Sequence, residues 1–247
     1  WVELTGGKCD NVDICIDVAM HVTDDAFWNQ LKHKAESGQY SGAQMDPQCK
    51  TFTRVRGWGH GPRPMRDTTP AGRYGIEDLS PEERIIVKTD TLLAIRTAIL
   101  CMILHKQNKP FIVENPAWIK DEVSIFMLDE FQAVLELAGV RTRTFVQCPT
   151  GSYSEKATTL LYFGLQLPVE WFLAECPHQH QWWRMADGEW FWARRPTLTG
   201  KQLAYLPADW TWNRIREQQD EFVSKRAAHY TEELNKGLAV VMMKGIT

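Results

Sequence analysis

The sequence lacks the features that mark membrane, secreted and repeat proteins. Its most apolar long segment, residues 92–104, is too short and too interrupted to span a bilayer. Residues 1–20 show no basic start followed by an apolar run, so we predict no signal peptide. Internal repeats and low-complexity segments are also missing. We therefore expect no membrane partner and an intracellular location, in the nucleus or the cytoplasm.

A strong charge of one sign and a regular cysteine pattern are missing as well. The net charge of the 247 residues is −3, which by itself indicates neither a nucleic acid nor a membrane as a partner. The six cysteines are scattered without the spacing of a disulfide framework. This scatter favours a reducing compartment.

Tryptophan, by contrast, is abundant in the last third of the chain. Six of the eleven tryptophans gather between residues 182 and 212: Trp182, Trp183, Trp190, Trp192, Trp210 and Trp212. This shift in composition predicts two parts. The first is a domain over residues 1–165, and the second is a tryptophan-rich C-terminal extension over residues 166–247 that ends in a charged helix.

Apolar runs bounded by turn residues alternate with amphipathic stretches and predict an α/β fold. The runs predict strands at residues 12–18, 41–46, 110–115, 140–148 and 158–164. Strands that alternate with helices form parallel βαβ units, so the order predicts a doubly wound sheet.

Three helices are predicted between these strands. The first covers residues 23–37, with Thr23 as its N-cap. The second is a long helix within residues 79–109, which opens on a Ser80–Glu83 capping box with proline at the first helical position. The third covers residues 121–139 and is stopped by its final glycine.

Reactive side chains follow two of the predicted strands. Asp46, Pro47 and Cys49 come after the strand at residues 41–46, and Glu114 and Asn115 end the strand at residues 110–115. The carboxyl ends of parallel strands meet at one edge of a sheet, which is where such sheets bind ligands. We therefore expect the thiol and the two carboxylates to share this edge.

Five segments carry a resemblance through their order and spacing: "PQCKTFTRVR" (47–56), "RPMRD" (63–67), "VENPAW" (113–118), "QCPTGSYSEKATTLLYF" (147–163) and "CPHQHQWW" (176–183). Together they resemble a methyltransferase-like family found beside reverse transcriptases in eukaryotic retroelements, which is itself similar to DNA cytosine-5 methyltransferases. The resemblance spans roughly residues 21–215. It implies a Rossmann-like methyltransferase sheet, mostly parallel with a terminal antiparallel strand, and a nucleic-acid partner, with DNA expected.

The resemblance implies methylation of a base by S-adenosylmethionine. Cys49 would be the thiolate that adds to C6 of cytosine, which makes C5 nucleophilic, and Glu114 would support the base near N3. A second chemistry stays open, because Asp46-Pro47-Gln48 also looks like the Asp-Pro-Pro-aromatic motif of amino-methyltransferases. There Asp46 would hold an exocyclic amine, and Phe52 would be the displaced aromatic.

The cofactor site implied by the resemblance is incomplete at its start. Two glycines at residues 5–11 are not followed by a helix, so we expect the chain to enter after the first βα unit of the fold. The residues assigned to the cofactor are Glu3, Asp13 or Asp17 for the ribose, His21 in place of an acid near the adenine, and Pro47.

The loop over residues 50–73 is basic and suits a phosphate-bearing substrate. Against one acid, Asp67, it carries Lys50, Arg54, Arg56, Arg63, Arg66 and Arg73. The residues assigned to the substrate are Lys50, Arg54, Arg56, Arg66, Asn115 and Lys156. The Cys/His segment at residues 176–180 does not have the spacing of a standard zinc module, so no metal is expected. The alternative to an enzyme is a catalytically inactive nucleic-acid-binding or interaction module of a mobile-element polyprotein.

Overall fold

A computed structural model describes the following residues, to which all structural statements refer: 10–12, 20–53, 56, 63–119, 121–147, 156–168, 180–184, 190–194 and 232–246. The chain forms two compact units. The first comprises residues 1–143, 159–166 and 239–247, and the second comprises residues 144–158 and 167–238. The first unit gives way to the second after residue 166, whereas the predicted boundary follows residue 165. Residues 239–247, at the end of the chain, belong to the first unit again.

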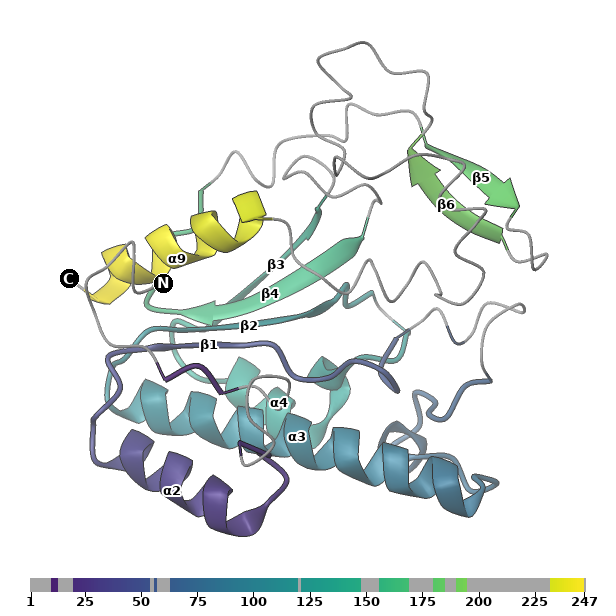
Figure 1. Cartoon of the computed structure of the whole chain (residues 1–247), viewed down its shortest axis with the longest axis horizontal. Helices are drawn as coiled ribbons and strands as arrows, with labels where there is room; N and C mark the ends of the chain where they lie inside the picture. The colour runs from purple at the N-terminus through teal and green to yellow at the C-terminus, as the bar shows by residue number, and fades with distance from the viewer. Residues whose placement is uncertain are drawn as a thin grey trace. The chain divides into compact units, whose positions relative to one another are not determined.

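An open mixed sheet organises the fold. Its strands are β1 (Ala43–Met45), β2 (Phe111–Pro116), β3 (Arg141–Val146) and β4 (Ala157–Phe163), in the order β1-β2-β4-β3 (Figure 1). β1 and β2 are parallel, and the other neighbouring strands are antiparallel. β1, β2 and β3 therefore share a direction, and β4 runs against them.

The α/β class is confirmed, and the four predicted strands from residue 41 onward are present. The expectation of a mostly parallel sheet is wrong for neighbouring strands in the described part, where β1 and β2 form the single parallel pair. The reason is that β4 returns between β2 and β3 and separates two strands of the same direction. The strand predicted at residues 12–18 falls almost wholly outside the described residues.

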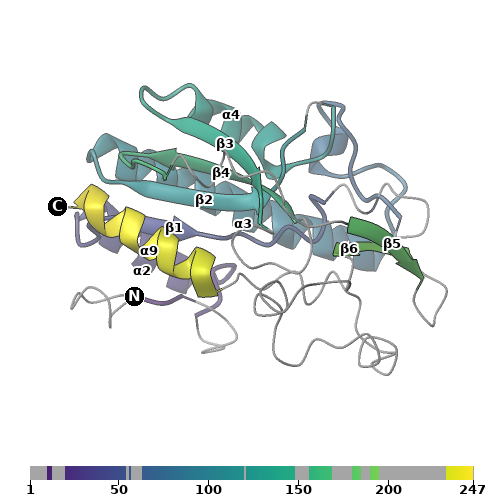
Figure 2. The same ribbon diagram turned by 90° about the horizontal axis from the view of Figure 1, so that it is seen from above.

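Helices lie on both faces of the sheet. α2 (Asp25–Glu36), α3 (Pro81–Lys106) and α4 (Asp129–Leu135) lie on one side (Figure 1 and Figure 2). On the other side, the last turns of α9 (Glu232–Ile246) place Met242 against Gly42 beside β1. The second unit contains an antiparallel pair, β5 (His180–Arg184) and β6 (Trp190–Arg194).

The predicted start of α3 is confirmed in detail. Ser80 Oγ accepts the backbone N–H of Glu83 at 3.2 Å, and the Glu83 carboxylate accepts the backbone N–H of Ser80 at 2.9 Å. Pro81 occupies the first helical position, where its missing N–H costs no hydrogen bond. This reciprocal cap fixes the end of α3 that faces the basic loop.

Two other helix predictions need correction. The N-cap of α2 is Asp24, whose Oδ1 accepts the N–H of Phe27 at 2.8 Å, because the Thr23 hydroxyl instead contacts Nδ1 of His21. The third helix is shorter than predicted, since Leu128 is extended and separates α4 from a 3₁₀ turn, η3 (Ile125–Met127). Burial of the η3 side chains in the core outweighs continuous helical periodicity there.

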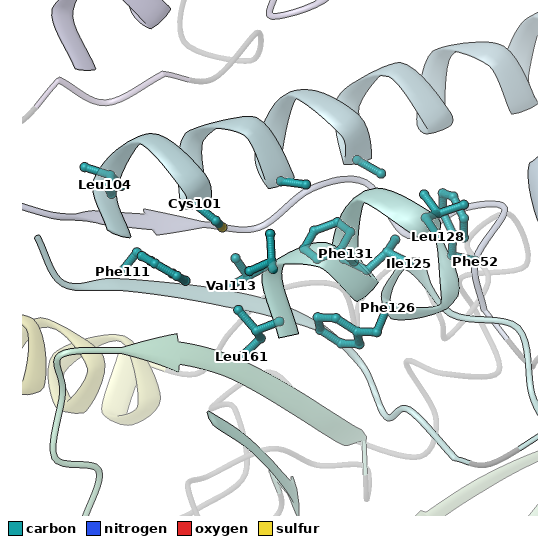
Figure 3. Packing of buried hydrophobic residues seen from close by; sticks show 13 residues of the cluster. Phe52, Cys101, Leu104, Phe111, Val113, Ile125, Phe126, Leu128, Phe131 and Leu161 are labelled. Atoms are coloured by element: carbon teal, nitrogen blue, oxygen red, sulfur yellow. The ribbon is translucent and has the colours of Figure 1, made fainter. Parts of the chain in front are cut away.

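A single apolar cluster fills the space between the sheet and helices α3 and α4. Figure 3 shows its members, which include Phe52 from the loop after β1 and Leu128 from before α4. Cys101 of α3 is fully buried in this cluster, and its burial raises the pKa of the thiol. Phe52 is 1% exposed, so the loop that carries Cys49 is tied into the core three residues later.

Replacing Ser80 with alanine tests the cap of α3. The Ser80→Ala variant should lose about 1 kcal/mol of unfolding free energy, because the N–H of Glu83 loses its acceptor. Urea unfolding followed by circular dichroism measures this loss. Thr68→Ala, an exposed change in the preceding loop, is the control and should unfold as the wild type does. Equal stability of Ser80→Ala and wild type would contradict the capping role.

Candidate functional site

The ends of β1 and β2 meet at one edge of the sheet. The parallel register pairs Met45 with Val113, so the segments that follow leave the sheet side by side. The side chain of Asn115 donates from Nδ2 to the carbonyl of Pro47 at 3.2 Å, which continues this alignment beyond the strands. Residues 68 positions apart in the sequence are thus held together at this carboxyl edge.

The carboxyl edge is rich in hydrogen-bond acceptors of differing exposure. Asp46 is exposed and accepts from Nε2 of Gln44 at 3.2 Å. Glu114 is buried at 6% exposure, and Asn115 at 1%. The Oδ1 atom of Asn115 is buried and has no hydrogen-bond partner among the residues that the structure describes. A buried amide oxygen without a donor carries a free-energy cost.

Cys49 begins a tight turn that is anchored to α3. The carbonyl of Cys49 accepts the N–H of Phe52 at 2.9 Å. Inside the turn, Thr51 donates its backbone N–H and its hydroxyl to Oδ2 of Asp90, at 2.9 and 2.7 Å. Cys49 itself is half-buried. The turn therefore holds the thiol at the carboxyl edge without burying it.

Arg66, assigned above to the substrate, lies inside the protein at 2% exposure. Its guanidinium lies 3.7 Å from the centre of the Phe52 ring. Burial lowers the pKa of Arg66 to about 10, while the nearby Asp90 carboxylate acts in the opposite direction, so the side chain stays charged at neutral pH. Its hydrogen bonds reach Thr51 Oγ1 (2.9 Å), Arg73 O (2.7 Å), Val87 O (2.9 Å) and Thr91 Oγ1 (2.9 Å).

Asp90 is not among the predicted site residues, although its place in the sequence indicates that it is buried. It falls in the helical stripe formed by Val87, Ala94, Ala98 and Cys101 on the buried face of α3. A carboxylate in such a stripe needs a partner inside the protein. Burial raises the pKa of Asp90, against its hydrogen bonds to Thr51 and the charge of Arg66.

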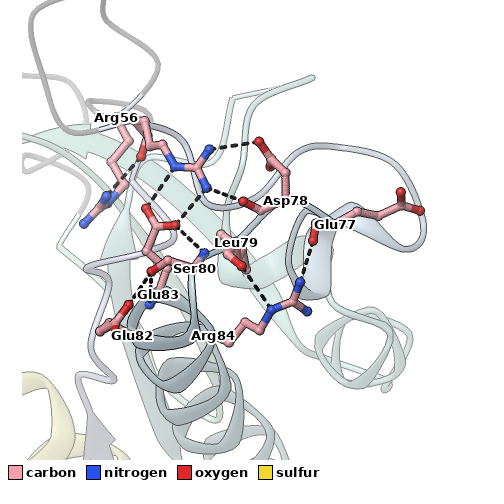
Figure 4. Close-up of polar contacts among 9 residues, drawn as sticks. Arg56, Glu77, Asp78, Leu79, Ser80, Glu82, Glu83 and Arg84 are labelled. Atoms are coloured by element: carbon pink, nitrogen blue, oxygen red, sulfur yellow. Dashed lines mark hydrogen bonds and ion pairs between the residues drawn. The ribbon is translucent and has the colours of Figure 1, made fainter.

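Two more arginines of the basic loop, Arg56 and Arg63, take part with Asp78 and Glu83 in a surface network that we call the arginine latch. Figure 4 labels Arg56, Asp78 and Glu83 of this network. Arg63 donates to both oxygens of Glu83 at 2.9 and 2.8 Å and to Oδ2 of Asp78 at 3.0 Å. Arg56 donates to the carbonyls of Lys50 and Arg63 at 2.7 and 3.1 Å. The hydrogen bond from Arg63 is the main cause that lowers the pKa of Glu83 to about 2.

The remaining substrate residues are placed separately. Lys50 is exposed beside the Cys49 turn, whereas Arg54 lies outside the described residues. Lys156 belongs to the second unit, where its carbonyl accepts the N–H of Gln147 at 3.3 Å. In the described part of the basic loop, Arg66 is therefore buried and Arg63 is paired with acids, while Lys50 is exposed.

The cofactor residues are brought together less than the catalytic ones. Glu3, Asp13 and Asp17 lie outside the described residues. His21 contacts Thr23, and its carbonyl accepts the N–H of Asp24 at 2.8 Å at the start of α2. The carbonyl of Pro47 is used by Asn115. Of the residues assigned to the cofactor, the structure therefore describes His21 and Pro47.

Comparisons with protein-family models, curated proteins and solved structures find no match for this chain. Among the described residues, no group of three or more His, Cys, Asp or Glu side chains could hold a metal ion. Within the same residues, no helix is both long and apolar enough to cross a membrane.

The arginine latch should make the unfolding stability of the protein depend on pH in acid. Glu83 has its pKa lowered from 4.5 to about 2, so its ion pair contributes in full above pH 4.5 and is lost as the pH falls toward 2. The urea concentration at the unfolding midpoint should therefore fall less between pH 4.5 and pH 2 in Glu83→Gln than in the wild type. About 0.5 M salt should reduce this difference between the two proteins, because salt screens the ion pair. Glu77→Gln is the control, since the Glu77 side chain points away from the latch (Figure 4). A wild-type pH profile in Glu83→Gln would refute the latch.

Proposed function

We propose that this chain carries a methyltransferase-like domain that binds a nucleic-acid base at the carboxyl edge of β1 and β2. The observation that carries the proposal is the parallel pairing of these strands together with the hydrogen bond from Asn115 to Pro47. It holds the Asp46–Cys49 segment beside the Glu114–Asn115 segment, as the resemblance requires of a thiol and a carboxylate that act on one base.

Burial and acceptor chemistry support base recognition. Glu114 and Asn115 are buried. The Oδ1 atom of Asn115 has no hydrogen-bond donor among the described residues. Amino groups and protonated ring nitrogens of bases are such donors. The half-buried Cys49 would supply the thiolate in cytosine methylation, whereas the exposed Asp46 would accept an exocyclic amine in the competing chemistry.

The strand directions support the finer fold assignment that belongs to this proposal. A Rossmann-like methyltransferase sheet whose last strand is reversed accounts for β1, β2 and β3 running one way and β4 running the other. We propose that the described strands are the later part of such a sheet. S-adenosylmethionine would be the methyl donor.

A second candidate function is an inactive interaction module. It is favoured by the state of the basic loop, where Arg66 is buried and Arg63 is paired with Asp78 and Glu83. The guanidinium groups of both arginines already have hydrogen-bond acceptors within the protein. A module of this kind would keep the sheet but would not methylate a base.

Binding and methyl transfer distinguish the two functions. Fluorescence anisotropy with a short cytosine-containing single strand at low salt should show saturable binding, and Glu114→Gln should weaken it about tenfold, because a carboxylate accepts more strongly than an amide. Glu136→Gln, at an exposed position after α4, is the matched control and should bind as the wild type does.

Transfer of labelled methyl from S-adenosylmethionine to DNA then separates the two chemistries. Loss of transfer in Cys49→Ser with retention in Asp46→Asn would identify cytosine C5 as the acceptor, and the reverse would identify an exocyclic amine. No oligonucleotide binding at all would overturn the proposal in favour of the interaction module.

A further inference from the structure

Two buried opposite charges lie next to the candidate site and are joined through a single hydroxyl. Thr51 Oγ1 donates to Oδ2 of Asp90 at 2.7 Å and accepts from Nε of Arg66 at 2.9 Å. The exposed fractions of Thr51, Arg66 and Asp90 are 2%, 2% and 1%. We call these three residues the Thr51 bridge.

The Thr51 bridge gathers three segments of the chain. Arg66 reaches the carbonyls of Arg73 in the loop and Val87 in α3, while Asp90 holds the backbone of the turn through the N–H of Thr51. Burial of an ion is costly unless its hydrogen bonds are satisfied in the native geometry. The hydrogen bonds of Arg66 and Asp90 are satisfied when the turn has its native position against α3. The bridge therefore resists displacement of the turn relative to α3.

The turn that the bridge holds is the one that presents Cys49. The hydrogen bond from the Phe52 N–H to the Cys49 carbonyl joins the thiol-bearing residue to the ring that lies under the Arg66 guanidinium. Cys49 is two residues from the bridging hydroxyl, whereas its strand, β1, ends at Met45. The segment between the strand and the turn is thus held near β1 by the hydrogen bond from Asn115 to Pro47 and at the turn by the bridge.

We propose that Thr51, Arg66 and Asp90 are positioning residues that set the exposure and orientation of Cys49 at the carboxyl edge. The inference rests on the proposed function for what Cys49 does there. The position of Cys49 can be measured without any substrate or cofactor. In this role, Arg66 supports the site from inside the protein and does not contact a phosphate.

Thr51→Val tests the bridge, because valine keeps the branched shape and removes the hydroxyl. Under native conditions, the rate of Cys49 alkylation by iodoacetamide, read by peptide mass spectrometry, should rise about tenfold. Thr51→Ser retains the hydroxyl and should restore the wild-type rate. Thr68→Val, an exposed change in the same loop, is the matched control and should leave the rate unchanged.

Cys101 reports global unfolding within the same samples, since it is fully buried in the core. Faster labelling of Cys49 with Cys101 still protected supports positioning. Equal acceleration of both thiols, or an unchanged Cys49 rate, overturns it. If Thr51→Val does not fold, Asp90→Asn is measured in the same way, and it should give the same selective increase. Failure of oligonucleotide binding would count against the proposed function and leave this result intact.

Discussion

Parallel pairing of β1 with β2 is the constraint on which the candidate site depends. It brings an exposed carboxylate, a half-buried thiol, a buried carboxylate and a buried amide to one edge of the sheet. Side chains from two distant segments become neighbours because their strands run the same way in register. The hydrogen bond between Asn115 and Pro47 carries that alignment past the last strand residues, where the pairing of the backbone has ended.

Helix α3 supports this edge at several points along its length. Its capped N-terminus supplies Glu83 to the arginine latch, and Asp90, about two turns further along, holds the Cys49 turn. Near its middle, Arg96 reaches the carbonyl of Val22 and the carboxylate of Asp25, which ties the start of α2 to the same helix. A helix anchored in the core through Cys101 and Leu104 gives these polar contacts a fixed frame.

The sequence predicted what is local or follows from strand direction. The Ser80 cap depends on four adjacent residues, and the shared edge follows from two parallel strands, so both could be foreseen. The Thr51 bridge joins residues 15 and 39 positions apart, and no local pattern gives such pairings. Arg66 therefore looked like a loop cation. The sequence predicted a longer helix than α4 because helical periodicity continues through residues 125–127. Burial of Ile125 and Phe126 in the core outweighs this local preference.

The arginine latch changes what a polyanion would meet at this surface. Asp78 and Glu83 already occupy the donors of Arg63 with oxygen anions, much as phosphate oxygens would. An incoming nucleic-acid backbone would exchange one set of anions for another instead of neutralising an open cation. Its binding would release fewer counterions than a count of arginines implies, and its affinity would fall less steeply with added salt.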